Sequence, residues 1–170
     1  MSPSTAAHRE YRAKHHNNPN GLNLNGRHVH QLREFGQLDE VMADPDPIRV
    51  LVAEDDDEMR QMLTDELRDA GYEVIAVEDG RQLFDWIDEP ISKPWCPKPD
   101  LVISDIKMPG FTGLDVLGAL RKSDWAMPVI LITAFGDRET HEEAKRLGAA
   151  HILDKPFDLD DLIDKARNIL

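Results

Sequence analysis

Five short apolar runs, each followed by a stretch with helical spacing, constrain the fold of this chain most strongly. The runs are mostly aliphatic and occupy residues 48–53, 74–77, 101–104, 129–132 and 152–153. Apolar runs of this length, bounded by turn residues, are typical of strands that are covered on both faces. Because a strand–helix unit repeats five times, the sequence predicts an α/β fold with a parallel sheet and five helices on its two faces.

The stretches between the runs carry apolar residues three or four positions apart, as helices with one buried face do. In the first of them, Met59 and Met62 begin a stripe that continues to Ala70, and we interpret both methionines as core residues. Gly71 follows as the expected C-terminal cap. Residues 89–99 contain four prolines and are predicted to be a connection without helix.

Residues 1–47 differ in composition from the rest of the chain. They are rich in Asn, His and Gly and contain few aliphatic residues before Val29. Such a segment buries too little apolar surface to offset its ordering entropy, so we predict a largely disordered extension. Apolar residues recur from His28 onward, which predicts a short helix over residues 28–43. A second unit, the folded domain, is expected at residues 48–170.

Charge and cysteine content restrict the environment and the partners. The formal net charge of −13 argues against direct binding to nucleic acid. No apolar run reaches the ~20 residues that a membrane-spanning helix needs, so no membrane insertion is expected. Cys96 is the single cysteine, which excludes an internal disulfide and favours a reducing compartment. A cytoplasmic protein is therefore expected.

Reactive side chains follow four of the five predicted strands. Glu54 and Asp55 follow the first strand, Asp105 the third, Thr133 the fourth and Lys155 the fifth. In a doubly wound sheet of order 2-1-3-4-5, these four strands are neighbours and the second lies at an edge. The sequence therefore predicts that these side chains meet in one crevice at the carboxyl ends of the strands.

The chemistry of this group points to phosphoryl transfer. Three converging carboxylates repel one another, and a hard divalent cation such as Mg²⁺ would offset that repulsion. Asp105 can act as a nucleophilic carboxylate that accepts a phosphoryl group. Lys155 can supply a positive charge to a phosphoryl oxygen, and the Thr133 hydroxyl can donate a hydrogen bond to another.

Four motifs resemble those of the receiver domains of two-component response regulators. They are Val50-Leu51-Val52-Ala53-Glu54-Asp55, Ser104-Asp105 with Met108-Pro109-Gly110, Ile132-Thr133-Ala134, and Lys155-Pro156-Phe157. The resemblance implies a flavodoxin-like fold of strand order 2-1-3-4-5. It also implies a phosphoacceptor in a two-component or phosphorelay pathway, served by a histidine kinase or phosphotransfer protein and acting on a downstream protein target.

The same resemblance assigns roles to individual residues. Asp105 would be the phosphorylation site and a ligand of Mg²⁺. Asp55 would bind the metal directly, Glu54 would act through water, and the carbonyl of Lys107 would be a backbone ligand. Thr133 and Lys155 would contact the phosphoryl group, and the bond from Lys155 to Pro156 would be cis.

The chain also departs from the family's pattern. Ile152 occupies the position three residues before the lysine, where the family often has Tyr or Phe as a switch residue. The proline-rich connection at 89–99 is longer than usual. Because the sequence ends after its fifth predicted helix, it resembles a stand-alone regulator of the chemotaxis type.

Two other functions compete with the phosphoacceptor. A phosphorylation-independent interaction module on the same scaffold is one alternative, because Ile152 cannot report phosphorylation through a hydroxyl. A Mg²⁺-dependent hydrolase with an aspartyl-phosphate is the other. Haloacid-dehalogenase-like enzymes need a second Asp two residues after the nucleophile, where this chain has Lys107, so we expect no enzyme beyond self-phosphorylation and autodephosphorylation.

Overall fold

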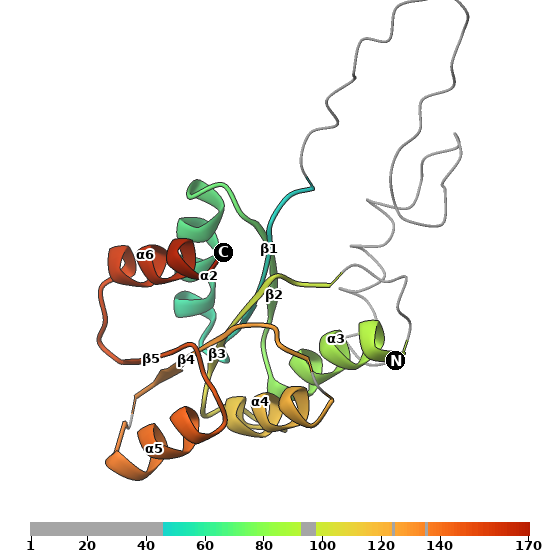
Figure 1. The fold of residues 1–170 in the computed structure, drawn as a ribbon. Coiled ribbons are helices and arrows are strands. Elements are labelled where there is room, and N and C mark those ends of the chain that lie inside the picture. The colour runs from blue at the N-terminus through green and yellow to red at the C-terminus, as the bar shows by residue number, and fades with distance from the viewer. Residues whose placement is uncertain (1–45, 93–97, 124, 135) are drawn as a thin grey trace, which may run out of the picture.

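Five parallel strands form a single sheet in the order β2-β1-β3-β4-β5 (Figure 1). This computed structural model describes residues 46–92, 98–123, 125–134 and 136–170. The predicted extension and the predicted helix at 28–43 lie outside the described residues. The strands are β1 Arg49–Ala53, β2 Glu73–Val77, β3 Leu101–Asp105, β4 Val129–Thr133 and β5 His151–Asp154. The strand order predicted from the sequence is confirmed.

The central strands are buried along their whole length. All five residues of β3 and all five of β4 are buried, as a strand covered by helices on both faces requires. The register pairs Val52 with Ile103 and Ile103 with Ile130, which places aliphatic residues in rows across the sheet. The same register brings the carboxyl ends of β1, β3 and β4 to one edge.

Two helical layers cover the sheet (Figure 1). Helices α2 Asp57–Asp69 and α6 Leu159–Ile169 pack on one face through residues such as Leu63 and Leu162. Helices α3 Gly80–Ser92, α4 Gly113–Lys122 and α5 Arg138–Arg146 cover the other face. None of the helices in the described ranges is long and apolar enough to cross a membrane.

Polar N-terminal caps fix the points at which the helices begin. Asp56, Thr112, Asp137 and Asp158 each accept a hydrogen bond from a backbone amide in the first turn of the following helix. Such caps satisfy amides that have no partner within the helix. Each cap lies a few residues after a strand end, so the caps set the conformation of the loops around the crevice.

Glycine permits a close approach beside the loop that follows β3. A Cβ atom at Gly80 would lie 1.7 Å from the backbone oxygen of Phe111, which no side chain can tolerate. The Gly80 amide also donates to the carbonyl of Pro109 at 3.0 Å. The start of α3 therefore packs directly against the 106–112 loop.

Two predictions from the sequence are wrong. Met62 is 41% exposed rather than part of the core, because the buried side of α2 is centred on Leu63 and Leu67 and turns the preceding residue outward. Helix α3 extends to Ser92, whereas residues 89–99 were predicted to form a connection. Proline removes only one helical hydrogen bond, and the apolar face that α3 buries overrides this local preference.

Candidate functional site

Three carboxylates meet where β1 and β3 end. Glu54 and Asp55 follow β1 directly, and Asp105 is the last residue of β3. One carboxylate oxygen from each side chain lies within 4.8 Å of the others. The structure therefore brings together the three acidic residues that the sequence placed in one crevice.

Glu54 is the most deeply buried of the three carboxylates, with 1% of its surface exposed. Its Oε2 accepts a hydrogen bond from Lys155 Nζ at 2.7 Å, and its Oε1 accepts one from the Asp56 amide at 3.4 Å. The guanidinium of Arg60 donates to the Glu54 carbonyl at 2.8 Å. Helix α2 and the end of β5 thus hold Glu54 from two sides.

Asp105 is fixed through its side chain and its backbone. The amide of Lys107 donates to Oδ2 at 3.0 Å, and Lys155 Nζ lies 3.4 Å from Oδ1. The Ser104 hydroxyl donates to the Asp105 carbonyl at 2.8 Å. A Cβ atom at Gly113 would lie only 2.7 Å from that same carbonyl oxygen, so the start of α4 packs tightly beneath Asp105.

Lys155 and Thr133 lie on adjacent strand ends. The Lys155 amide donates to the Thr133 carbonyl at 2.8 Å, which continues the pairing of β4 with β5 beyond the last strand residues. Thr133 is 1% exposed, and the Lys155 side chain is 19% exposed. The bond from Lys155 to Pro156 is cis, as the resemblance implied.

Burial and the contacts among them shift the pKa values of Glu54, Asp105 and Lys155. It raises the pKa of Glu54 and of Asp105, and Lys155 opposes part of each shift through its hydrogen bonds and its charge. Burial lowers the pKa of Lys155, but the hydrogen bond to Glu54 and the charges of Asp105 and Glu54 outweigh it, so the net shift is upward. The lysine therefore keeps its positive charge beside two carboxylates that are costly to ionise.

The donor set fits a hard divalent cation. Its three carboxylates face one lysine, so the ionised group has an excess of negative charge. Carboxylate oxygens are preferred ligands of Mg²⁺, which usually keeps several waters and binds phosphate oxygens at the same time. Asp55 is exposed, so this side of the group is accessible to such an ion.

Two residues that support the site were not identified from the sequence, and the acidic residues that follow Asp55 have other roles. Asp56 caps α2, and Asp57 pairs with Arg60 in its first turn, so neither belongs to the acidic group. The contact of Arg60 with the Glu54 carbonyl was missed, as was the close packing of Gly113 under Asp105. The packing of Gly113 could have been suspected from the sequence, because a glycine at the first position of a helix is a sign of close packing.

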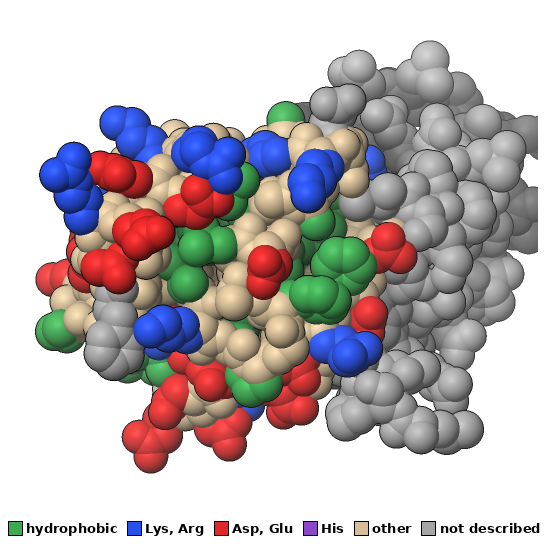
Figure 2. Space-filling view, turned by 90° about the horizontal axis from the view of Figure 1, so that it is seen from below, with side chains coloured by type: hydrophobic (Ala, Val, Ile, Leu, Met, Phe, Trp, Pro, Cys, Tyr) green, Lys and Arg blue, Asp and Glu red, His purple; other side chains and the backbone are tan. Residues whose placement is uncertain are grey.

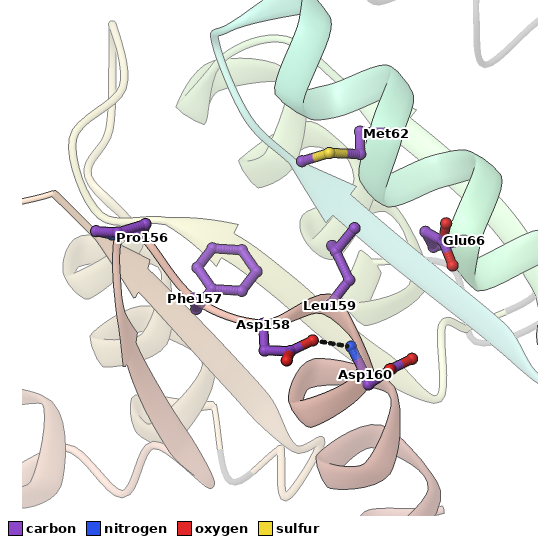
Figure 3. Close-up of a pocket in the computed structure, with 7 residues that line it drawn as sticks. All are labelled: Met62, Glu66, Pro156, Phe157, Asp158, Leu159 and Asp160. Atoms are coloured by element: carbon purple, nitrogen blue, oxygen red, sulfur yellow. Dashed lines mark hydrogen bonds between the residues drawn. The ribbon is translucent and has the colours of Figure 1, made fainter.

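A shallow groove adjoins this site between α2 and the loop that follows β5 (Figure 3). It has a volume of about 550 Å³. Met62 comes from α2, whereas Pro156, Phe157 and Leu159 come from the loop and the start of α6. Because Pro156 directly follows Lys155, a molecule bound in this groove would lie beside the acidic site.

Comparison with characterised proteins identifies the family. A family model described as the response regulator receiver domain matches residues 50–167. The chain is 42% identical over 122 residues to the C4-dicarboxylate transport transcriptional regulatory protein DctD of Pseudomonas aeruginosa, covering 72% of this chain and 25% of that protein. It is 30% identical to sporulation initiation phosphotransferase F of Bacillus subtilis, covering 72% of this chain and 93% of that protein.

The first curated relatives are longer proteins, and the chain spans 25% of DctD and 54% of the transcriptional regulatory protein PdtaR of Mycobacterium tuberculosis. Solved structures agree with the sequence match. The Vibrio cholerae chemotaxis protein CheY4 superposes with a TM-score of 0.63 at 31% identity, covering 73% of this chain and 99% of that one. The response regulator TrrA of Thermotoga maritima, in complex with Mg²⁺-BeF, gives 0.59 at 33% identity and covers 72% of this chain and 98% of its own. The chain therefore belongs to the response regulator receiver domain family.

Proposed function

We propose that this protein is a phosphoacceptor of a two-component or phosphorelay pathway, with Asp105 as the residue that accepts the phosphoryl group. The observation that supports this most directly is the arrangement around Asp105. Its carboxylate lies beside two further acidic residues and 3.4 Å from the Lys155 ammonium group. Family membership adds independent support, because receiver domains are the phosphoacceptors of such pathways.

In the proposed reaction, an oxygen of the Asp105 carboxylate attacks the phosphorus atom of the donor. A new O–P bond forms, and the bond between phosphorus and the donor's nitrogen or oxygen breaks, with its electron pair leaving on the donor. Lys155 stabilises the negative charge of the transferred group, and the Thr133 hydroxyl donates a hydrogen bond to it. The amide of Lys107 keeps the carboxylate oriented through its 3.0 Å hydrogen bond to Oδ2.

Mg²⁺ is the proposed cofactor. Asp55, Asp105 and the carbonyl of Lys107 would bind the ion, and Glu54 would act through water. When bound, the ion would neutralise negative charge on the carboxylates and on the phosphoryl oxygens. The presence of Mg²⁺-BeF in the complex of the related TrrA supports this choice of metal.

The groove of Figure 3 is where we propose that the phosphoryl donor docks. Met62 is an exposed apolar residue, and Phe157 and Leu159 are half-buried on the other side of the groove. A histidine kinase or phosphotransfer protein that covers these residues would bring its phosphohistidine next to Lys155. The cytoplasmic location predicted from the sequence suits such a donor and stays a prediction.

The second candidate is an interaction module that works without phosphorylation, and Ile152 is the observation that favours it. Ile152 is half-buried and packs against the core on the α3–α5 side of the sheet. Its side chain has no hydroxyl that could report the state of Asp105. We do not propose a hydrolase function, because Lys107 occupies the position two residues after Asp105 where such hydrolases need a second Asp.

Incubation with Mg²⁺ and acetyl phosphate tests the phosphoacceptor directly. Intact-mass spectrometry of the whole chain should show an increase of one phosphoryl group that is stable in acid and lost in base. The increase should require Mg²⁺ and should disappear in Asp105→Asn. Asp69→Asn provides a matched control, because Asp69 is an exposed carboxylate at the end of α2.

A wild-type protein that gains no phosphoryl group while a known receiver domain in parallel does would contradict the proposal. An increase that persists in Asp105→Asn would move the acceptor to another residue. Full binding of a downstream partner by Asp105→Asn would instead support the interaction module.

A further inference from the structure

Arg60, near the start of α2, reaches back to the backbone on both sides of Asp55. Its Nη1 donates to the Glu54 carbonyl at 2.8 Å and to the Asp55 carbonyl at a longer distance of 3.5 Å. These carbonyls belong to the two planar peptide groups that flank Asp55. Because the backbone rotates only between such planes, contacts with both of them restrict the direction in which the Asp55 side chain leaves the chain.

The backbone of Asp55 lies between the sheet and the helix. Pairing of β1 with β3 ends at Ala53 and Ser104, and α2 begins at Asp57 after its N-cap. The Arg60 amide is held in the helix by a 2.9 Å hydrogen bond to the Asp56 carbonyl. The guanidinium therefore extends from a fixed helical position to the short connection that carries Asp55.

The position of Arg60 is unfavourable for the helix by itself. A cation near the start of a helix faces the positive end of the helix dipole. Lys and Arg side chains on the face seen in Figure 2 stand out from the surface, whereas the Arg60 side chain is only 18% exposed. Burial of a charged group is costly unless hydrogen bonds compensate it.

The ion pair of Arg60 with Asp57 does not account for this burial. Nη2 of Arg60 contacts the Asp57 carboxylate, but the Asp57 side chain is 86% exposed. Pairs that are open to solvent contribute little to stability. The hydrogen bonds to the backbone at Glu54 and Asp55 are therefore the contacts that give the buried guanidinium a purpose.

We propose that Arg60 is a positioning residue for the metal site, which directs the Asp55 carboxylate towards Glu54 and Asp105 by fixing the peptide groups around it. The proposal rests on the proposed function, because it assigns Arg60 a part in the Mg²⁺ site. Arg60 acts through the backbone and contacts neither the metal nor the phosphoryl group. Residues that orient metal ligands in this way affect metal affinity strongly.

Mg²⁺ affinity distinguishes positioning from charge by its sign. If Arg60 acted only as a nearby cation, its removal would strengthen Mg²⁺ binding, since like charges repel. Positioning predicts the opposite. Calorimetric titration of the whole unphosphorylated chain with Mg²⁺ should show about tenfold weaker binding in Arg60→Met than in the wild type.

Two further variants locate the effect. Arg60→Lys keeps the charge but loses the planar fork of donors, so its Mg²⁺ affinity should lie between those of the wild type and Arg60→Met. Arg68→Met makes the same substitution at an exposed position in the last turn of α2 and should leave the affinity unchanged.

The dependence of phosphorylation on Mg²⁺ gives a second readout. With acetyl phosphate as donor, Arg60→Met should react more slowly than the wild type when Mg²⁺ is limiting. Its rate should approach that of the wild type when Mg²⁺ is saturating, because Asp105 and Lys155 keep their contacts with each other. A rate that stays low at saturating Mg²⁺ would overturn the proposal.

Unchanged or stronger Mg²⁺ binding in a folded Arg60→Met would also overturn it, even if urea unfolding shows a loss of stability, because Arg60 would then be a purely structural residue. If Arg60→Met does not fold by circular dichroism, Arg60→Lys decides, and wild-type Mg²⁺ affinity in that variant would overturn the proposal. Mg²⁺ binding that depends on Arg60 in a chain that acetyl phosphate does not label would support this proposal and remove the phosphoacceptor. Labelling of a wild type that binds no Mg²⁺ would do the reverse.

Discussion

Lys155 Nζ lies 2.7 Å from Glu54 Oε2, which joins the end of β5 to the end of β1 across 101 positions of sequence. The same ammonium group is 3.4 Å from Asp105 Oδ1. One cation therefore binds two buried carboxylates at the ends of different strands.

Removing the shared cation should destabilise the protein most when no metal is present. Lys155→Met leaves Glu54 and Asp105 without their positive partner, and we expect the free energy of unfolding to fall by about 1–3 kcal/mol, less than for a fully buried pair because solvent reaches the site. Added Mg²⁺ should stabilise the variant more than it stabilises the wild type. Urea unfolding with and without Mg²⁺ measures both effects.

Lys165→Met serves as the control for that substitution. Lys165 pairs with Asp161 on the exposed side of α6, and surface pairs contribute about 0–1 kcal/mol. Its loss should change the stability little and should not alter the response to Mg²⁺. Equal responses of the two variants to Mg²⁺ would contradict a special role for Lys155.

The stability of the metal-free protein should depend on pH through Glu54. Burial raises the pKa of Glu54 and of Asp105, so the folded protein binds more protons than the unfolded chain between the ordinary and the raised pKa values. In that range these two groups contribute more stability as the pH falls, and they cost stability as it rises towards neutrality. Glu54→Gln should remove part of this dependence.

The free energy of unfolding should be measured for wild type and Glu54→Gln from pH 7 down to about pH 4, where the ordinary pKa of a carboxylic acid lies. As the pH falls, the free energy of unfolding of the wild type should increase relative to that of Glu54→Gln. Mg²⁺ affinity, measured by calorimetry, should change in the opposite direction because protons compete for the same oxygens. A difference that does not vary with pH would contradict the raised pKa of Glu54.

A methyl group at Gly113 should disturb Asp105 without touching its side chain. The Cβ atom of Gly113→Ala would lie 2.7 Å from the Asp105 carbonyl and 3.1 Å from Leu131 Cδ2, so strand or helix must shift. We expect a loss of about 1–3 kcal/mol in stability, as for other overpacked sites. Phosphorylation by acetyl phosphate should slow as well.

Gly118→Ala in the same helix is the matched control. Its Cβ atom would meet only Leu147 Cδ2 at 3.9 Å, so the substitution should be neutral or should stabilise the protein by about 0.5–1 kcal/mol. Phosphorylation should proceed at the wild-type rate. If both alanine variants behave alike, the packing of α4 under Asp105 does not matter for the site.

The capping box at the start of α4 should be measurable on its own. Thr112 and Asp115 bind each other's backbone amides. The Thr112 hydroxyl also donates to the Asp115 carboxylate, and this bond, together with the one from the Thr112 amide, lowers the pKa of Asp115. Thr112→Ala should reduce stability by about 1 kcal/mol at neutral pH. An acid whose pKa is lowered by folding stabilises the folded protein at pH values above its pKa in the unfolded chain. The difference in free energy of unfolding between wild type and Thr112→Ala should therefore shrink as the pH falls below about 4. A constant difference down to pH 3 would contradict the role of the Asp115 carboxylate.

The sequence revealed the sheet and the strand-end residues because both depend on local patterns. A strand such as β4, buried at every position, shows as an uninterrupted aliphatic run, and the residue after it can be identified without a structure. The strand order came from the resemblance to receiver domains, and it makes neighbours of the four strands that end in reactive side chains. The strand ends on one edge of the sheet bring together residues as distant in sequence as Glu54 and Lys155.

What the sequence did not reveal depends on tertiary packing. Met62 has the spacing of a core residue, but α2 buries the side that carries Leu63 and Leu67 and leaves Met62 exposed. Pro90 indicates a helix end locally, yet α3 continues because its other face is buried. The packing of Gly113 beneath Asp105 arises from contact between two elements, which no single stretch of sequence contains.

The most direct test of Asp105 as the phosphoryl acceptor is to locate the phosphoryl group on the chain. After reaction with Mg²⁺ and acetyl phosphate, borohydride reduction converts an aspartyl phosphate to homoserine, which tandem mass spectrometry can place in a peptide. Homoserine is expected at position 105 alone, and none is expected when Mg²⁺ is omitted. Homoserine at position 55 or elsewhere, or none under conditions that label a known receiver domain, would contradict it.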